Sequence, residues 1–311
     1  MARHPSPITP DLSEPSHTLA GKAGSLLAML WRDKTALVSA LFLLLVAGAA
    51  IFGAWLVDPS SLTVNLRGRN LPPFSLDQGW LYVLGADSLG RSILSRIIVG
   101  SSYTIGIAVA SVLVALVVGG ALGLVAGYRG GWVSSVILRT ADIIMSFPSL
   151  LLALIVLYVL GGHVATLIMV LALSRVPIFL RTCRAEVLEI RERLFVTASR
   201  VMGASSPRLI WRHILPATLP TLINLATLEF AFVMLAESSL SFLGLGVQSP
   251  GISWGLMVSD GRAHLASAWW LSFWPGVAIT LTAICANVLA GWVQTVNDPA
   301  QKWRLEARRN T

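Results

Sequence analysis

Residues 101–127 read SSYTIGIAVASVLVALVVGGALGLVAG, a run of 27 residues without a single charged side chain. A helix needs about 20 apolar residues to cross the hydrocarbon core of a bilayer, so this run predicts a transmembrane helix. Gly119, Gly123 and Gly127 recur every four residues and share one helix face, which allows another helix to approach closely. The stretch indicates a helical membrane protein.

The composition of the whole chain agrees with that interpretation. Of 311 residues, 55% are hydrophobic and 12% are charged, whereas soluble domains carry about 25% charged residues. In a membrane protein the net charge of +8 reflects Lys and Arg on the cytoplasmic side, so it does not indicate nucleic-acid binding. Cys183 and Cys285 lie in or beside apolar segments without metal-ligand spacing, and we expect packing residues and no metal site.

The predicted fold is an all-α integral membrane protein with about six spans, at residues 35–57, 101–127, 141–160, 164–180, 217–240 and 271–296. The fourth span is the weakest, because it carries Arg175 and Pro177, and the arginine could snorkel to the interface. Residues 101–297 form the expected core domain. Residues 1–34 are predicted to be a disordered tail, 58–100 and 241–270 external loops, 181–216 a cytoplasmic loop, and 298–311 a second tail.

Counting Lys and Arg over alternate loops gives the orientation. With the N-terminus inside, 18 of the 23 basic residues lie on the cytoplasmic side and five outside. This bias predicts that both termini are cytoplasmic.

The loop at 181–216 is basic and too elaborate for a simple connection. We predict one helix that ends near Met202, with Gly203 supplying the left-handed conformation after it. A second helix should begin at Ser206 as N-cap, with Pro207 as its first residue. The spacing leaves two interpretations open: an interfacial helix pair that only anchors the fifth span, or a docking element.

Residues 195–216 read FVTASRVMGASSPRLIWRHILP and resemble the EAA loop of ABC-importer permeases. The match rests on Thr197, Ala198, Ser199, Gly203, Ile214, Leu215 and Pro216, with ten residues after the glycine where the pattern has nine. Thr197 replaces the glutamate, so an ionic role of that glutamate does not apply here. Phe195, Ala204, Ser205 and Arg208 complete the residues that the resemblance assigns to coupling with an ATPase.

Further segments match in order: 84–91 (LGADSLGR), 126–132 (AGYRGGW), 147–150 (FPSL), 236–247 (AESSLSFLGLGV), 253–255 (SWG) and 260–262 (DGR). Together they resemble the C-type permease of dipeptide, oligopeptide and nickel ABC importers. Residues 290–295 (AGWVQT) depart from that pattern, which normally is charged there.

The resemblance implies a type I importer permease in the bacterial inner membrane, surrounded by lipid. Its implied partners are a second homologous permease, one or two cytoplasmic ATPases and an external solute-binding protein. The sequence contains no phosphate-binding Gly-x-x-x-x-Gly-Lys-Ser/Thr loop, so ATP and Mg²⁺ are expected on the ATPases and the chain itself is not expected to be an enzyme. The cargo stays open among dipeptides, oligopeptides, nickel chelates and other solutes.

Charged and polar residues within spans are functional candidates. Asp142 is expected to pair with Arg139 on its own helix, and Glu237 to tie the fifth span to the loop beyond it. Glu229 lies near mid-span, where it could line the path and meet a substrate amine, or bond to Asn224, Asn287 or a partner permease. A gradient-driven secondary transporter without an ATPase is the alternative function.

Overall fold

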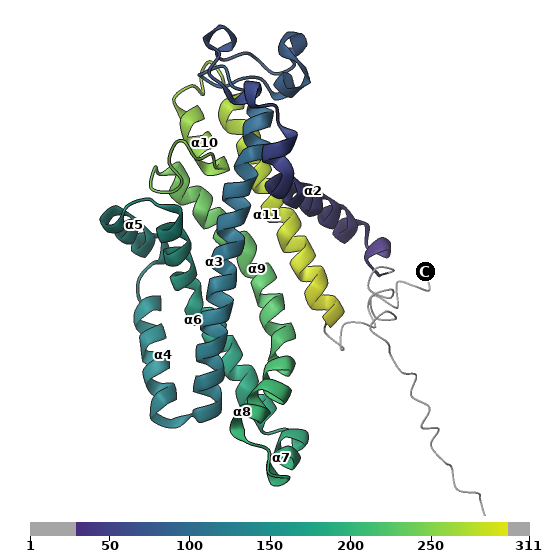
Figure 1. The fold of residues 1–311 in the computed structure, drawn as a ribbon, viewed down its shortest axis with the longest axis vertical. Helices are drawn as coiled ribbons and strands as arrows, with labels where there is room; N and C mark the ends of the chain where they lie inside the picture. The colour runs from purple at the N-terminus through teal and green to yellow at the C-terminus, as the bar shows by residue number, and fades with distance from the viewer. Residues whose placement is uncertain (1–28, 298–311) are drawn as a thin grey trace, which may run out of the picture.

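The computed structural model describes residues 29–297, and these form a helical bundle capped at one end by an irregular segment (Figure 1). The principal helices are α2 (Lys34–Leu56), α3 (Ile93–Arg129), α4 (Gly131–Met145), α5 (Ser149–Leu160), α6 (Val164–Arg191), α7 (Leu194–Val201), α8 (Ser206–Leu209), α9 (Leu215–Phe242), α10 (Trp254–Arg262) and α11 (Trp270–Asn297). The tails were predicted at 1–34 and 298–311, of which residues 1–28 and 298–311 lie outside the described residues. Residues 29–32 of the first predicted tail are helical, and Asp33 is the N-cap of α2.

Within the described residues, five helices are long and apolar enough to cross a membrane. They comprise α2, α3, α6, the continuous rod from α8 through α9, and α11. A bent pair of shorter helices, α4 and α5, makes a sixth candidate. The predicted number of about six spans agrees with this arrangement.

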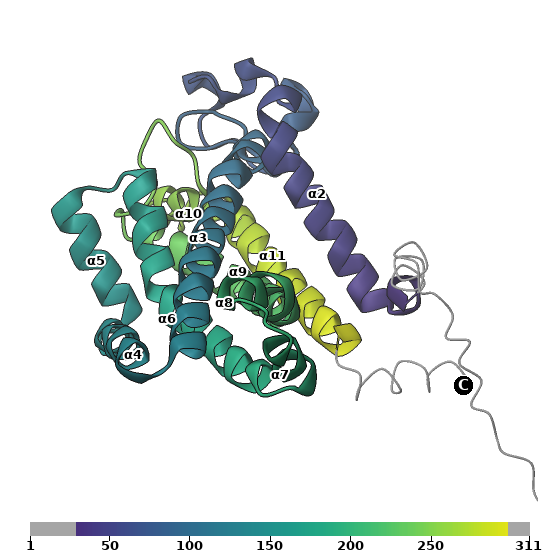
Figure 2. The same ribbon diagram turned by 60° about the horizontal axis from the view of Figure 1, so that its bottom comes forward.

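The third predicted span is not one straight helix. It begins earlier than residue 141 and divides into α4 and α5, which meet at a bend of 84°. Figure 2 shows α4 nearly end-on while α5 runs across the view. The break falls at Pro148, which donates no backbone hydrogen bond and disfavours helical geometry at Phe147 before it.

Two further spans extend well beyond their predicted ends. The fourth continues past residue 180 to Arg191, because Pro177 is accommodated inside α6. The second begins at Ile93 rather than at residue 101, with Ser92 accepting a hydrogen bond from the Ser95 N–H as N-cap. Part of each predicted loop therefore belongs to a helix.

The close contact between α3 and α6 depends on the predicted glycine face (Figure 1). A Cβ atom added to Gly119 would lie 2.6 Å from the Cβ of Phe179, and one added to Gly123 would lie 2.6 Å from the Cβ of Cys183. These distances are shorter than any real contact, so a larger residue would force the helices apart. The prediction that small residues allow close helix packing is confirmed.

The irregular segment between α2 and α3, residues 57–92, forms the cap seen at the top of Figure 1. Four short 3₁₀ turns follow one another, and one antiparallel bridge joins Ala86 to Ser92. Trp270 is buried beneath the cap and its indole N–H donates to the Ala86 carbonyl at 3.4 Å. The neighbouring Trp269 is half exposed, so only this tryptophan keeps the exposure expected of an aromatic belt.

Candidate functional site

Helices α7 and α8 form a hairpin at the end of the molecule opposite the cap (Figure 1). Val196 of α7 and Leu209 of α8 are almost fully buried, as is Ile214 just beyond, and all three belong to the hydrophobic core. The hairpin is thereby fixed to the bundle at three points.

The turn of this hairpin is closed by two backbone hydrogen bonds. Gly203 has a φ of +86°, its N–H donates to the Arg200 carbonyl at 3.0 Å, and the Ala204 N–H donates to the Ser199 carbonyl at 3.1 Å. This is the Schellman pattern that ends many helices with a left-handed glycine. The next helix starts one residue earlier than predicted, because Ser205 rather than Ser206 holds the extended N-cap position.

The hairpin presents large apolar side chains to its surroundings. Leu194 is 88% exposed, Met202 80% and Trp211 71%, and Val201 is exposed beside them. We call these four residues the hairpin surface. Thr197, Ala198, Arg208 and Pro216 are also exposed, whereas Ser199 donates its hydroxyl to the Phe195 carbonyl and the Phe195 ring lies against His213. Large exposed apolar groups of this kind mark contact surfaces.

The hairpin continues into the fifth span without a break. A π-helical turn over residues 210–214 joins α8 to α9, and the Leu215 N–H donates to the Ile210 carbonyl. The segment Ser206–Phe242 is therefore one rod of 37 residues, contrary to the separate helix and span predicted from the sequence. The π turn lies just before Pro216, whose nitrogen carries no hydrogen and cannot donate the next helical hydrogen bond. The wider turn allows the helix to continue through this position.

Asp142 does not pair with Arg139 on its own helix. Its carboxylate instead accepts a hydrogen bond from Arg181 of α6, so it joins α4 to α6. Both side chains are about half exposed. An ion pair this exposed contributes little stability, which makes it a surface contact between two helices.

Glu237 is fully buried near the cap end of α9. Its carboxylate accepts hydrogen bonds from Ser241 at 2.7 Å and Ser238 at 3.3 Å, and the Ser241 hydroxyl oxygen in turn accepts from the Val247 N–H. Glu237 therefore ties α9 to the loop that leads to α10.

Glu229 pairs with Arg175 of α6, with 3.5 Å between the nearest nitrogen and oxygen. The guanidinium carbon of Arg175 also lies 3.7 Å from the ring centroid of Phe232. Arg175 does not snorkel to the interface, because a carboxylate and an aromatic face lie beside it within the span. Asn287 donates its amide to the Ala283 carbonyl on α11, and Asn224 lies on α9 a turn and a half from Glu229.

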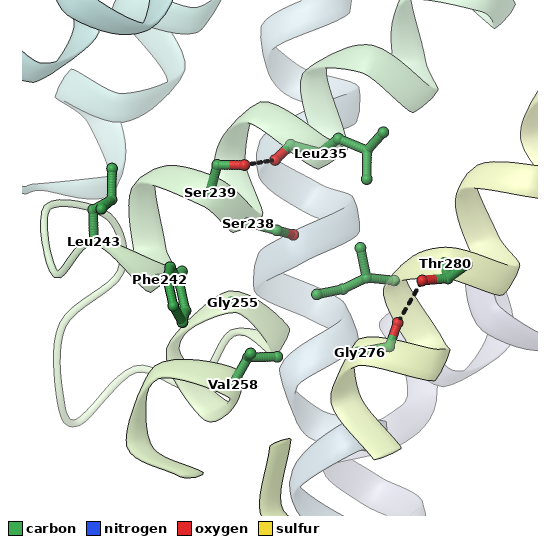
Figure 3. A pocket seen from close by; sticks show the side chains of 10 residues that line it. Leu235, Ser238, Ser239, Phe242, Leu243, Gly255, Val258, Gly276 and Thr280 are labelled. Carbon is green, nitrogen blue, oxygen red and sulfur yellow. Dashed lines mark hydrogen bonds between the residues drawn. The ribbon is translucent and has the colours of Figure 1, made fainter. Parts of the chain in front are cut away.

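A cavity of about 400 Å³ opens between α9, α10 and α11 (Figure 3). Leu235, Ser239 and Phe242 line it from α9 and Val258 from α10, and Thr280 lies opposite on α11. Its walls are mainly apolar with a few hydroxyl groups. Among the described residues no group of three or more His, Cys, Asp or Glu could hold a metal ion.

Residues 119–303 match the family described as binding-protein-dependent transport system inner membrane component. The chain belongs to this family. Similar proteins include a di/tripeptide transport system permease protein of Pseudomonas aeruginosa, 37% identical over 87% of this chain and 89% of the relative. A probable D,D-dipeptide transport system permease protein of Escherichia coli is 34% identical over 87% and 89%. A putative peptide transport system permease protein of Brucella abortus is 33% identical over 88% and 90%.

A solved structure gives the same fold for this inner membrane component. The MetNI methionine ABC transporter in an inward-facing form matches with a TM-score of 0.53 and 19% identity, over 65% of this chain and 97% of that chain. The all-helical permease fold expected from the sequence is confirmed. The chain is a multi-pass protein of the bacterial inner membrane.

The contact between Arg175 and Phe232 inside the membrane was not predicted from the sequence. Arg175 and Phe232 are 57 positions apart, and only the packing of α6 on α9 brings the guanidinium over the ring. A lone arginine in a weak span was a usable signal, because intramembrane charges seldom lack a partner.

Proposed function

We propose that this chain is one permease subunit of an ATP-driven importer of peptides, working with a second homologous permease. ATPase subunits dock on the hairpin surface, and an external solute-binding protein delivers the cargo. ATP and Mg²⁺ are held by the ATPases. Family membership supports this proposal, as do the three relatives described above, which are named as peptide transport permeases.

The observation that carries the proposal is the hairpin at the end of two long helices. It exposes Leu194, Val201, Met202 and Trp211, although it is anchored by buried residues on its other side. A partner protein would remove this apolar surface from water, with a gain of about 25 cal/mol for each Å² buried.

The same geometry provides a mechanism for coupling. α6 enters the hairpin and the α8–α9 rod leaves it, so a displacement of the hairpin by closing ATPases moves both helices together. Because both helices are continuous through their spans, the movement reaches the cavity between α9, α10 and α11. Alternating access then follows from tilting these helices against the partner permease.

The test is co-purification from native membranes of the wild-type chain and of the variant Leu194→Ser/Met202→Ser. We expect wild type to bring down a second permease and the ATPases, and the variant to keep the permease but lose the ATPases. Trp80→Ser in the cap is the control, because it removes a large apolar side chain that is also mostly exposed, at 68%, but lies far from the hairpin. Wild type that purifies alone and still transports would overturn the proposal and favour the gradient-driven transporter.

A further inference from the structure

The Arg175–Glu229 pair is unusual in being both intramembrane and loosely bonded. Its 3.5 Å separation exceeds the roughly 2.7–2.9 Å of a strong charge-assisted hydrogen bond. Among the described residues this is the one side-chain hydrogen bond of the Glu229 carboxylate, which can accept about four. Both side chains keep slight exposure, 13% for Arg175 and 11% for Glu229, so the pair has unused bonding capacity that can be reached from the surface.

The pair borders a continuous stripe along α9. The stripe consists of residues three or four positions apart, each half-buried or exposed: Thr221, Asn224, Leu228, Phe232, Leu235 and Ser239. At about 1.5 Å per residue it extends over roughly 27 Å, close to the thickness of the hydrocarbon core. Leu235 and Ser239 at its end line the cavity of Figure 3.

This stripe differs from a face that meets lipid. Ala226 and Phe230, on the opposite side of α9, line an apolar cavity against α3. The stripe itself carries polar side chains toward both ends, at Thr221, Asn224 and Ser239, and the charged pair borders it near its middle. Intramembrane charges usually face a bundle interior or a water-filled path, because lipid offers them no compensation.

We infer that this stripe is a wall of the translocation path and that Arg175 and Glu229 form a site that distinguishes passing peptides by their charge. The inference rests on the proposed function. A positively charged group of the peptide contacts Glu229, and a carboxylate contacts Arg175. Phe232, 49% exposed and stacked on the guanidinium, shields the pair when no peptide is present.

The first test measures import by the complete transporter in proteoliposomes with the peptides Lys-Ala-Ala and Glu-Ala-Ala, each loaded on the binding protein. Glu229→Gln should lower the ratio of lysine-peptide to glutamate-peptide import about tenfold relative to wild type, and Arg175→Gln should raise it by a similar factor, equivalent to about 1.4 kcal/mol each. Dividing by the wild-type ratio cancels the preference of the binding protein. Asp142→Asn, in the exposed pair with Arg181, should leave the ratio unchanged.

The outcomes separate the two proposals. If both variants slow both peptides by the same factor, the pair is only structural and this inference falls while the importer proposal stands. If wild type imports neither peptide although its ATPases co-purify, the peptide assignment itself fails.

A second test works even if the charge variants do not assemble. In a chain carrying Cys183→Ser and Cys285→Ser, Phe232→Cys should react with a charged, water-soluble thiol reagent during turnover, and bound Lys-Ala-Ala should slow that reaction. Leu44→Cys, on the exposed face of α2, is the lipid-facing control and should stay unlabelled. Absence of labelling at position 232 in resting and ATP-driven states would overturn the inference.

Discussion

The carboxylate of Asp87 lies 2.6 Å from the guanidinium of Arg96, and both side chains are buried where the cap meets α3. Asp87 also accepts from Arg91 at 2.8 Å, while Arg96 reaches Asp260 of α10 at 3.4 Å. Two segments about 165 positions apart in the sequence are thus joined by one charge network. The network holds the cap and α10 on the end of the bundle.

Replacing Asp87 with Asn should destabilise this end of the molecule. Among the described residues, the change leaves the buried Arg96 charge with Asp260, at 3.4 Å, as its one carboxylate partner. Breaking such a buried pair costs about 3 kcal/mol. The measurement is the midpoint of thermal unfolding of the purified protein in detergent. Arg67→Gln, an exposed cationic position in the same cap, should leave the midpoint unchanged, and an equal loss in both variants would contradict the argument.

The cap should also lose stability at alkaline pH through Tyr82. Burial, with Asp87 and Asp58 nearby, raises the pKa of its phenol above the ordinary value of 10.0. A raised pKa means that the folded state favours the protonated phenol, so this contribution is complete below pH 10 and is lost as the pH rises through the folded-state pKa. Tyr82→Phe should flatten the alkaline part of the unfolding midpoint against pH, whereas an unchanged profile would exclude Tyr82 as the source.

Helix contact between α3 and α6 should not tolerate one added methyl group at Gly123. The new Cβ would lie 2.6 Å from the Cβ of Cys183 and 2.7 Å from the Leu180 carbonyl oxygen. Overpacking of this kind costs about 1–3 kcal/mol. Gly106→Ala on the same helix is the matched control, because its Cβ meets nothing within 4 Å. Thermal unfolding should separate the two alanine variants clearly.

Softening the rod between the hairpin and the membrane should uncouple the transporter. Ala217→Gly/Leu219→Gly adds backbone freedom worth about 1 kcal/mol per glycine relative to alanine. We expect the ATPases to bind and hydrolyse ATP as before, with less peptide imported per ATP. The control Leu45→Gly/Ala47→Gly places the same changes in α2, which does not join the hairpin. Equal import per ATP in both variants would show that a stiff α9 is not needed to couple ATP hydrolysis to import.

The sequence predicted features set by local chemistry. Apolar runs located the spans, the glycine face located the α3–α6 contact, and Gly203 marked the end of α7. It could not predict features set by packing between distant segments. Asp142 pairs with Arg181 of α6 and not with a residue on the neighbouring turn of its own helix. Arg175 of α6 pairs with Glu229 of α9, across the interface between the two helices.

Helix ends were also hard to predict, for physical reasons. Pro177 stays inside α6 whereas Pro148 separates α4 from α5, although both lie in apolar segments. Which proline breaks a helix depends on whether neighbouring helices support the backbone around it. The π turn before Pro216 is a similar case, because it allows the rod to continue where a sequence pattern suggests a boundary.

Removing the Glu237 carboxylate should loosen α10 from α9 without disturbing the rest of the bundle. Glu237→Ala deprives Ser238 and Ser241 of their shared acceptor, and the latter also holds the Val247 N–H of the connecting loop. Loss of these buried hydrogen bonds should cost about 2 kcal/mol.

The readout is the rate of trypsin cleavage after Arg262, the exposed last residue of α10, which should rise several-fold as that helix detaches more often. Ser239→Ala is the control, because within residues 29–297 its hydroxyl bonds only to the Leu235 carbonyl on its own helix. If cleavage after Arg262 proceeds at the same rate in Glu237→Ala, Ser239→Ala and wild type, then the packing of Gly255 against Ser238, and not the carboxylate, holds α10 in place.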